Sequence, residues 1–405
     1  MKLSPKVFNH KHPFTIGVEE EYMLCNPKTG DLVDKVDVIM DLIDPSDNDR
    51  FSYELIKTEV EINTPVCQDV EQAMGEIRRL RNIIRDIGKQ NNFRMGISGT
   101  HPTAKPIEQN FVSAPGKQWV ANQMGYYAQR NITFATHVHV AVPDAESAIH
   151  ITNAMRRWIG PLLAISTNSP FFEGVKTGML SSRSFQFGAF PRTNVPITFE
   201  SYDQYKDLVN SFIDMGSIEK PRQIWWKIRP SMDFGTIEFR MFDIQRSLIR
   251  TRLLIALSQS LVHRAWSEFK DGTLAEDFRL DYIDDCYWKA SRFGFDVKVM
   301  DPKSMDILSM EEFILRMVDY AEPALKYFNN MDVIDTVKEI LEIGDIIYVE
   351  NITKNIFALR QLPVVNGGIV VMDPFTGRVL ALSGGFSFKK SEFNRATQAL
   401  RQPGS

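Results

Sequence analysis

Polar and apolar residues alternate along four short segments of the chain, and each segment carries ionisable side chains two positions apart. These pairs are Glu19 and Glu21, Glu59 and Glu61, His137 and His139, and Glu238 and Arg240. Successive side chains of a β-strand point to opposite faces, so each pair projects from one side of a sheet. The flanking residues, such as Ile237 and Phe239, are apolar. The pattern therefore predicts four strands whose charged side is not an ordinary solvent-facing surface.

Apolar residues at helical spacing mark the segments between these strands. Asp69 is a candidate N-cap with Gln72 three residues later, and apolar residues then recur every third or fourth position until Gly88. The same spacing predicts helices over about residues 145–167, 202–215, 246–270 and 310–343. Because strands and helices follow no regular β-α-β-α order, we predict an α+β fold, with a mostly antiparallel sheet and helices packed on one of its faces.

Composition narrows the class of partner. The 405 residues are 43% hydrophobic, enough for a sizeable core in one or two domains. The formal net charge is -4 and Lys and Arg are scattered, so we expect small-molecule partners and no nucleic acid. No run of about 18 apolar residues and no export signal is evident, which favours a cytoplasmic protein that binds no membrane. The three cysteines are widely spaced, as is typical of reduced thiols.

Carboxylates gathered on a sheet face need a counter-charge, because burying an unpaired carboxylate is costly and several together also repel. Oxygen-rich ligand sets favour Mg²⁺ or Mn²⁺. For residues 17–22 alone, an edge strand protected from aggregation by its acids is an alternative. A second acidic strand, preceded by Glu54, weakens that alternative. The two histidines at 137 and 139 fit either a metal site or hydrogen bonding within the core.

Arginines accompany the acidic strands. Arg183 lies in a Ser-, Arg-, Gly- and Pro-rich segment at 169–196, which is long enough to suggest a functional loop. Surface arginines are usually only solvated, but Glu238 and Arg240 share one strand face, as a site that holds both a cation and a phosphate requires. The sequence has no glycine-rich phosphate-binding loop. Metal ions and basic side chains would therefore have to hold the phosphates of any bound nucleotide.

At these motifs the chain resembles the type 2 glutamate-cysteine ligase family, also called carboxylate-amine ligases. The matching motifs run in order over about residues 12–343: GVEEEY at 17–22, VEINTPVC at 60–67, GTHP at 99–102, HVHV at 137–140, SSR at 181–183 and RPSMDFGTIEFR at 229–240. The resemblance implies a glutamine-synthetase-like fold, in which a curved, mostly antiparallel sheet binds metal ions and ATP on its concave face.

The resemblance also implies a reaction and a set of site residues. Glutamate and an amine, nominally cysteine, would form a γ-glutamyl amide through an acyl phosphate, while ATP becomes ADP. The implied ligands of Mg²⁺ or Mn²⁺ are Glu19, Glu21, Glu54, Glu61, His137 and Glu238. Arg240 and Arg229 would bind the nucleotide phosphates, and Arg240 and Arg183 would be the catalytic arginines. Whether the chain forms a homodimer is left open by the sequence.

Two other readings of this scaffold stay open. The first is a different phosphoryl-transfer chemistry, such as phosphorylation of a guanidino or amine group, which would give ADP without an amide. The second is an inactive or binding-only fusion product that retains nucleotide and metal binding. It arises because the resemblance to the ligases stops at about residue 343, short of the usual end of that domain.

From residue 344 onward another resemblance begins. GDIIYV at 344–349, MDPFTGRVL at 372–380, GGF at 384–386 and RQPGS at 401–405 resemble a class A penicillin-binding protein. Ser405 matches the nucleophile of that family, but the activating lysine and the later motifs do not follow it, so we expect no transpeptidase. We predict a ligase domain at 1–343 and an incomplete fragment at 344–405, with two paired strands between about residues 367 and 382.

Overall fold

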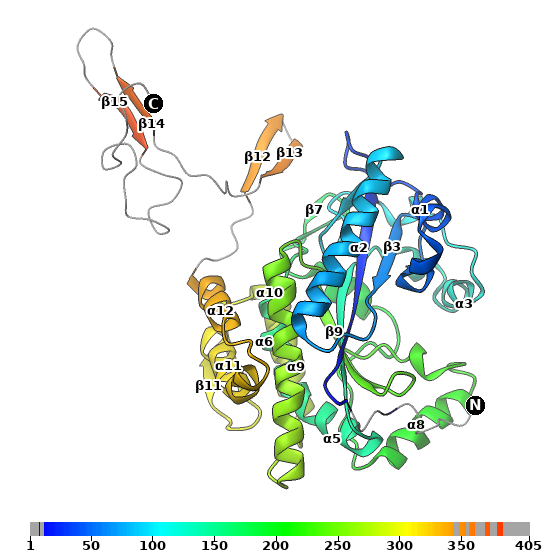
Figure 1. Cartoon of the computed structure of the whole chain (residues 1–405), viewed down its shortest axis with the longest axis vertical. Coiled ribbons are helices and arrows are strands. Elements are labelled where there is room, and N and C mark those ends of the chain that lie inside the picture. Colours follow the sequence, from blue (N-terminus) through cyan, green and yellow to red (C-terminus); the bar gives the residue numbers. More distant parts are fainter. Residues whose placement is uncertain are drawn as a thin grey trace. The chain divides into compact units, whose positions relative to one another are not determined.

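A seven-stranded sheet forms the centre of the first part of the chain (Figure 1). Its strands follow the order β2-β3-β1-β5-β9-β8, with β4 paired to the end of β1, and all pairings are antiparallel. The bounds are β1 Ile16–Cys25, β2 Phe51–Tyr53, β3 Glu59–Asn63, β4 Arg94–Gly96, β5 Ala135–Ala141, β8 Ile228–Ser231 and β9 Thr236–Asp243. The structure is a computed structural model that describes residues 8 and 12–342 and four later strands.

Four helices contact the strands of this sheet and bury its apolar face. They are α2 Val70–Gln90, α5 Ala145–Met155, α6 Ile159–Ala164 and α9 Leu248–Lys270. Val18, Val138 and Phe239 point from three neighbouring strands into the same hydrophobic cluster as the apolar residues of α5, α6 and α9. The prediction of an α+β fold with an antiparallel sheet is confirmed.

The remaining helices surround this core. They are α1 Val36–Leu42, α3 Pro115–Met124, α4 Tyr126–Gln129, α7 Ser182–Gly188, α8 Tyr202–Asp214, α10 Leu280–Phe293, α11 Met310–Tyr327 and α12 Val333–Glu342. Two short strand pairs, β6 Phe171–Phe172 with β7 Val175–Lys176 and β10 Lys298–Met300 with β11 Ile307–Ser309, complete this part of the chain. No helix in the described part of the chain is both long enough and apolar enough to cross a membrane.

The structure modifies several predicted boundaries. Helix α2 begins as predicted, since Asp69 Oδ1 accepts a hydrogen bond from the backbone N–H of Gln72 at 2.7 Å. The helix predicted at 310–343 is instead two helices, because α11 ends at Tyr327 and Asn329 adopts a positive φ of 58°. The predicted loop at 169–196 contains the β6–β7 pair and α7, and α10 was not predicted.

Strand β1 presents its successive glutamates to opposite sides of the sheet. Glu20 is fully buried on the helix side, where its Oε1 lies 2.7 Å from Nη2 of Arg81 on α2. Glu19 and Glu21 project from the other side, away from those helices, as strand alternation requires. The arrangement therefore ties β1 to the helical layer through Glu20 while its two neighbours remain available on the opposite face.

The chain divides into two compact units, residues 1–342 and residues 343–405. In the second unit β12 Tyr348–Thr353 pairs with β13 Ile356–Arg360, and β14 Ile369–Met372 pairs with β15 Val379–Ser383, both antiparallel. The β14–β15 pair confirms the two strands predicted between about residues 367 and 382. Ser405 lies outside the described residues.

Candidate metal and nucleotide site

The sheet face opposite the helices gathers carboxylates and histidines from four adjacent strands. The antiparallel register places Glu21 opposite Glu61, Glu19 opposite His137, and His139 opposite Glu238. These pairs link β3, β1, β5 and β9 in the order in which the strands lie in the sheet. Side chains that are far apart in the sequence therefore meet on one continuous surface.

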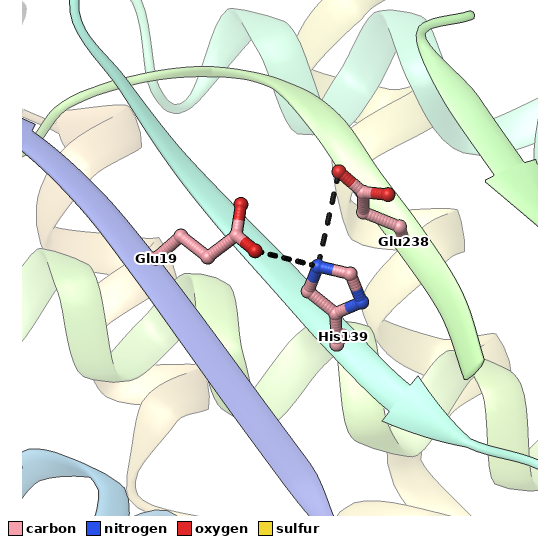
Figure 2. A group of neighbouring side chains, drawn as sticks. All are labelled: Glu19, His139 and Glu238. Carbon is pink, nitrogen blue, oxygen red and sulfur yellow. Dashed lines mark ion pairs between the residues drawn. The ribbon is translucent and has the colours of Figure 1, made fainter. Parts of the chain in front are cut away.

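Glu19, His139 and Glu238 form the first group of candidate metal ligands. Their nearest ligand atoms all lie within 4.8 Å of one another. His139 Nε2 is 3.3 Å from Glu19 Oε1 and 3.8 Å from Glu238 Oε1 (Figure 2). This nitrogen is buried and has no hydrogen-bond partner among the described residues. The other ring nitrogen, Nδ1, is 2.8 Å from Thr236 Oγ1, a contact that fixes the orientation of the ring.

His137 lies beside this group and shares Glu19 with it. Its Nδ1 is 3.0 Å from Glu19 Oε2, while its buried Nε2 has no partner among the described residues. Burial, reinforced by the positive charge of Arg240, lowers the pKa of His137 to about 4, so the ring is neutral near pH 7. If Nδ1 donates its proton to Glu19, Nε2 carries the lone pair, which is the state that a metal ligand needs.

Glu21, Glu54 and Glu61 form the second group, and their nearest oxygens also lie within 4.8 Å of one another. The backbone N–H of Ala135 donates to Glu21 Oε2 at 2.6 Å, which fixes that carboxylate. Glu59 lies two positions before Glu61 on β3 and is only 2% exposed. By strand alternation it projects from the same face as Glu61, so a fourth carboxylate adjoins the group.

Burial and mutual repulsion raise the pKa values of Glu21, Glu59 and Glu61. Burial, together with the charge of Glu54, raises the pKa of Glu21 to about 7. Burial and then neighbouring carboxylates raise the pKa values of Glu59 and Glu61 well above their ordinary value. Such groups are costly to ionise together without a cation. The donor set of carboxylate oxygens with the neutral imidazole of His137 therefore fits a divalent ion such as Mg²⁺ or Mn²⁺.

Two arginines share the carboxylate of Glu238. Arg229 Nε lies beside Oε2 and Arg240 Nη1 lies beside Oε1, so both oxygens face a guanidinium group. Burial opposes ionisation of Glu238, but Arg229 and Arg240 outweigh it and hold the pKa of the carboxyl group below its usual range. Arg229 on β8 and Arg240 on β9 thus place two positive charges beside Glu238, which belongs to the first group of ligands.

A basic and aromatic region borders the arginines. Arg183 on α7 donates to the backbone carbonyls of Arg240 at 3.1 Å and Met241 at 3.3 Å, while its buried Nε has no partner among the described residues. The Phe187 ring lies within 6.0 Å of the charged groups of Arg183, Arg240 and Lys227. Burial, followed by the charges of Arg183 and Arg240, lowers the pKa of Lys227 to about 7.

A cavity of about 450 Å³ lies next to this region. Its walls carry Lys227, Arg192, Asp284 and the aromatic side chains of Phe190, Tyr287 and Trp288. That volume is within the usual range for small-molecule pockets, and apolar walls with a few polar groups are typical of them. Lys227 lines the cavity and is hydrogen-bonded to β9 of the acidic sheet face. The backbone N–H of Arg240 donates to the carbonyl of Lys227 at 2.9 Å.

The predicted residues separate into distinct places on this face. Glu19 and Glu238 join the first group, Glu21, Glu54 and Glu61 form the second, and His137 lies beside Glu19. The predicted set omitted His139 and Glu59, although each lies two positions from a predicted ligand, so strand alternation was an available signal. It also omitted Lys227, for which the sequence pattern gives no comparable signal.

Comparison with known proteins assigns the family. Residues 15–346 match the model of glutamate-cysteine ligase family 2, and the chain belongs to that family. A protein named "Putative glutamate--cysteine ligase 2" from Herpetosiphon aurantiacus is 32% identical over 83% of this chain and 87% of its own length. A protein of the same name from Chloroflexus aggregans is 33% identical over 76% of this chain and 79% of its own length.

Solved structures share the fold. Glutamate–cysteine ligase from Francisella tularensis, in complex with AMP, matches with a TM-score of 0.61 at 12% identity, over 83% of each chain. A bifunctional glutathione synthetase from Pasteurella multocida matches with a TM-score of 0.57 at 12% identity, over 82% of this chain and 48% of that one.

Family membership confirms the prediction of a glutamate–cysteine ligase-type enzyme. The family match ends at residue 346, so it gives no support to the resemblance of residues 344–405 to a penicillin-binding protein. The roles of individual site residues, the cytoplasmic location and the division into a ligase domain and a fragment stay predictions.

Proposed function

We propose that this protein is an ATP-dependent carboxylate–amine ligase that joins the γ-carboxylate of glutamate to an amine, nominally cysteine. The observation that carries the proposal is the sheet face on which two carboxylate groups adjoin Arg229 and Arg240. Such a face has binding partners for a divalent ion and for a phosphate, and ATP with its metal supplies both. The likeness in fold to the Francisella ligase supports the glutamine-synthetase-like form of the sheet.

The residues that would hold Mg²⁺ or Mn²⁺ are those of the two groups together with His137: Glu19, Glu21, Glu54, Glu61, His137, His139 and Glu238. The buried Nε2 of His137, which has no partner among the described residues, and the position of His139 Nε2 between two carboxylates support their inclusion. A divalent ion held by these residues would supply positive charge to neutralise the phosphate oxygens during phosphoryl transfer. The protein's own contribution is to hold these ligands in place, through the hydrogen bond between His139 Nδ1 and Thr236 Oγ1, the one from the backbone N–H of Ala135 to Glu21, and the strand register.

In the first step an oxygen of the glutamate γ-carboxylate attacks the γ-phosphorus of ATP, the bond to the ADP oxygen breaks, and an acyl phosphate forms. Arg240 and Arg229 bind the phosphates, because their ion pairs with Glu238 hold both guanidinium groups at the site. These two side chains stabilise the negative charge that spreads over the transferring phosphoryl group.

In the second step the amine nitrogen attacks the acyl carbon, a proton leaves the nitrogen, and phosphate departs to give the amide. Arg183 stabilises the tetrahedral oxyanion; its two Nη atoms are held by backbone carbonyls, whereas its buried Nε is unpaired in the described structure. The cavity beside Lys227 is placed to receive an organic substrate, and Lys227 and Arg192 suit a carboxylate on it.

The test is glutamate-dependent ADP release with Mg²⁺ across a panel of amines that includes cysteine. We expect amine-stimulated release and a γ-glutamyl amide product from the native chain, and loss of both in Glu61→Gln. Glu108→Gln is the matched control, because Glu108 is exposed and lies outside the site. ADP formed with a phosphorylated amine in place of an amide would establish the alternative kinase chemistry. Mn²⁺ binding by a folded chain without turnover would favour the binding-only protein.

A further inference from the structure

Helix α3 is joined to the acidic face by one charged side chain. Lys117 Nζ of α3 lies 2.8 Å from Glu54 Oε1, and the two side chains are 29% and 20% exposed. Among the described residues, this is the only side-chain hydrogen bond or ion pair between α3 and another element. The hydrophobic core clusters include no residue of α3, although Ala121 of this helix is itself buried. The Lys117–Glu54 pair is therefore the main polar anchor of this helix.

Lys117 also interacts with more than its direct partner. The charges of Glu54, Glu61 and Glu59 all favour its protonated form, and together they outweigh burial and raise the pKa of Lys117 above its usual range. In return, Lys117 lowers the pKa values of Glu59 and Glu61 against the stronger effects of burial and of the other carboxylates. The ammonium group thus acts as a counter-charge to Glu54, Glu59 and Glu61, whereas the positive charges that act on Glu21 are those of Arg183 and Arg240.

One ammonium cannot balance that group. Glu21, Glu54, Glu59 and Glu61 would carry four negative charges when ionised, and Lys117 supplies one positive charge. A divalent ion supplies twice that charge and accepts several oxygen ligands at once. Because Lys117 Nζ binds Oε1 of Glu54, a divalent ion bound by the same carboxylate would bring a second positive charge close to the ammonium, and the two charges would repel each other.

We propose that Lys117 is a resident cation of the Glu21–Glu54–Glu61 group, and that a divalent ion entering the group displaces its ammonium from Glu54. The inference rests on the proposed function, which makes this group part of the metal site. It makes Lys117 a positioning residue, since it acts through Glu54.

The first experiment measures how fast lysine amines of the full chain are acetylated, by mass spectrometry, without metal and with saturating Mn²⁺. Acetylation of Lys117 should become several-fold faster with Mn²⁺, because a displaced ammonium is no longer held by Glu54. Lys105 is the internal control: its side chain is 69% exposed and its ion pair with Glu108 is 3.7 Å long, so its rate should not change. An unchanged or slower rate at Lys117, in a chain that binds Mn²⁺, overturns the proposal.

The second experiment compares Mn²⁺ affinity, by electron paramagnetic resonance, in Lys117→Met and Lys117→Arg. The methionine variant removes the competing charge and should bind Mn²⁺ about tenfold more tightly, equivalent to about 1.4 kcal/mol. The arginine variant retains the charge and should resemble the native chain, as should Lys105→Met. Equal affinity in all four proteins contradicts the proposal.

The two hypotheses fail in different ways. A native chain that binds no Mn²⁺ refutes the metal site and the role of Lys117 together. A native chain that binds Mn²⁺ and releases ADP, but in which Mn²⁺ leaves the acetylation of Lys117 unchanged, refutes only the role of Lys117. The acetylation measurement uses the native chain, so it does not depend on the folding of a variant.

Discussion

Replacement of Arg81 by methionine should strongly destabilise the ligase unit. Arg81 is 7% exposed and forms two hydrogen bonds to Glu20, from Nε to Oε2 at 3.0 Å and from Nη2 to Oε1 at 2.7 Å. Its remaining contacts include the backbone carbonyls of Gln245 at 2.9 Å and Arg246 at 3.2 Å, just before α9. One guanidinium group therefore joins α2, β1 and the chain entering α9.

The magnitude follows from what the substitution leaves behind. Methionine fills much of the same volume but cannot donate a hydrogen bond, so the fully buried carboxylate of Glu20 loses its counter-charge. Removing one partner of a buried ion pair costs about 3–5 kcal/mol, most of it from the uncompensated charge. Adding Glu20→Gln to Arg81→Met should recover at least about 1 kcal/mol, because a neutral amide is less costly to bury than a carboxylate.

The assay is urea denaturation followed by circular dichroism, with Arg79→Met as the matched control. Arg79 lies on the same helix but is 42% exposed, and its ion pairs with Asp47 and Glu76 are at the surface. Its loss should lower the free energy of unfolding by less than about 1 kcal/mol. If Arg81→Met and Arg79→Met cost the same within about 1 kcal/mol, the argument from the buried pair is wrong.

Three further predictions test other parts of the structure. Burial disfavours the charged form of Asp301, but hydrogen bonds from Arg157 and Arg316 lower its pKa to about 2. Because this folded-state pKa is below the ordinary value of 3.8, the group stabilises the protein by about 2 kcal/mol above pH 4, and denaturation curves should show that contribution disappear as the pH falls through 2. Gly160→Ala should lower the free energy of unfolding by about 1–3 kcal/mol in the same assay, since a Cβ there would lie 2.3 Å from Cys286 Sγ. Gly75→Ala is the control: a Cβ there would meet no atom within 4 Å, so this variant should be neutral or stabilising. Mn²⁺ at about 100 times its dissociation constant should stabilise the native chain by about 2.7 kcal/mol, as measured by thermal unfolding, and chelation or Glu61→Gln should abolish most of that gain.

Strand periodicity explains why the charged face could be predicted from the sequence. Each acidic or histidine pair has i, i+2 spacing between apolar neighbours, and alternation alone places such pairs on one side of a sheet. The apolar neighbours Val18, Val138 and Phe239 are indeed buried together on the other side. Helix α2 was predictable for a similar reason, because its cap and its apolar stripe are local features.

The pairing between strands could not be predicted in the same way. In the β5–β9 pair the register shifts between Thr136 and Val138, and His139 comes to lie opposite Glu238. Such an irregularity depends on contacts between segments about a hundred residues apart and leaves no local signal. The position of Lys117 is a second example, because α3 is a short helix whose approach to Glu54 is a tertiary contact.

The three successive glutamates of β1 restrict how this protein can evolve. Substitutions elsewhere on the strand change single side chains, but inserting or deleting one residue before Glu19 within β1 would exchange the two faces for every later position. Glu19 and Glu21 would then turn into the apolar helical layer, and Glu20 would leave Arg81 for the site. Substitutions in this segment should therefore be tolerated far more easily than changes in its length. Natural relatives should differ at its apolar positions but align through it without a gap.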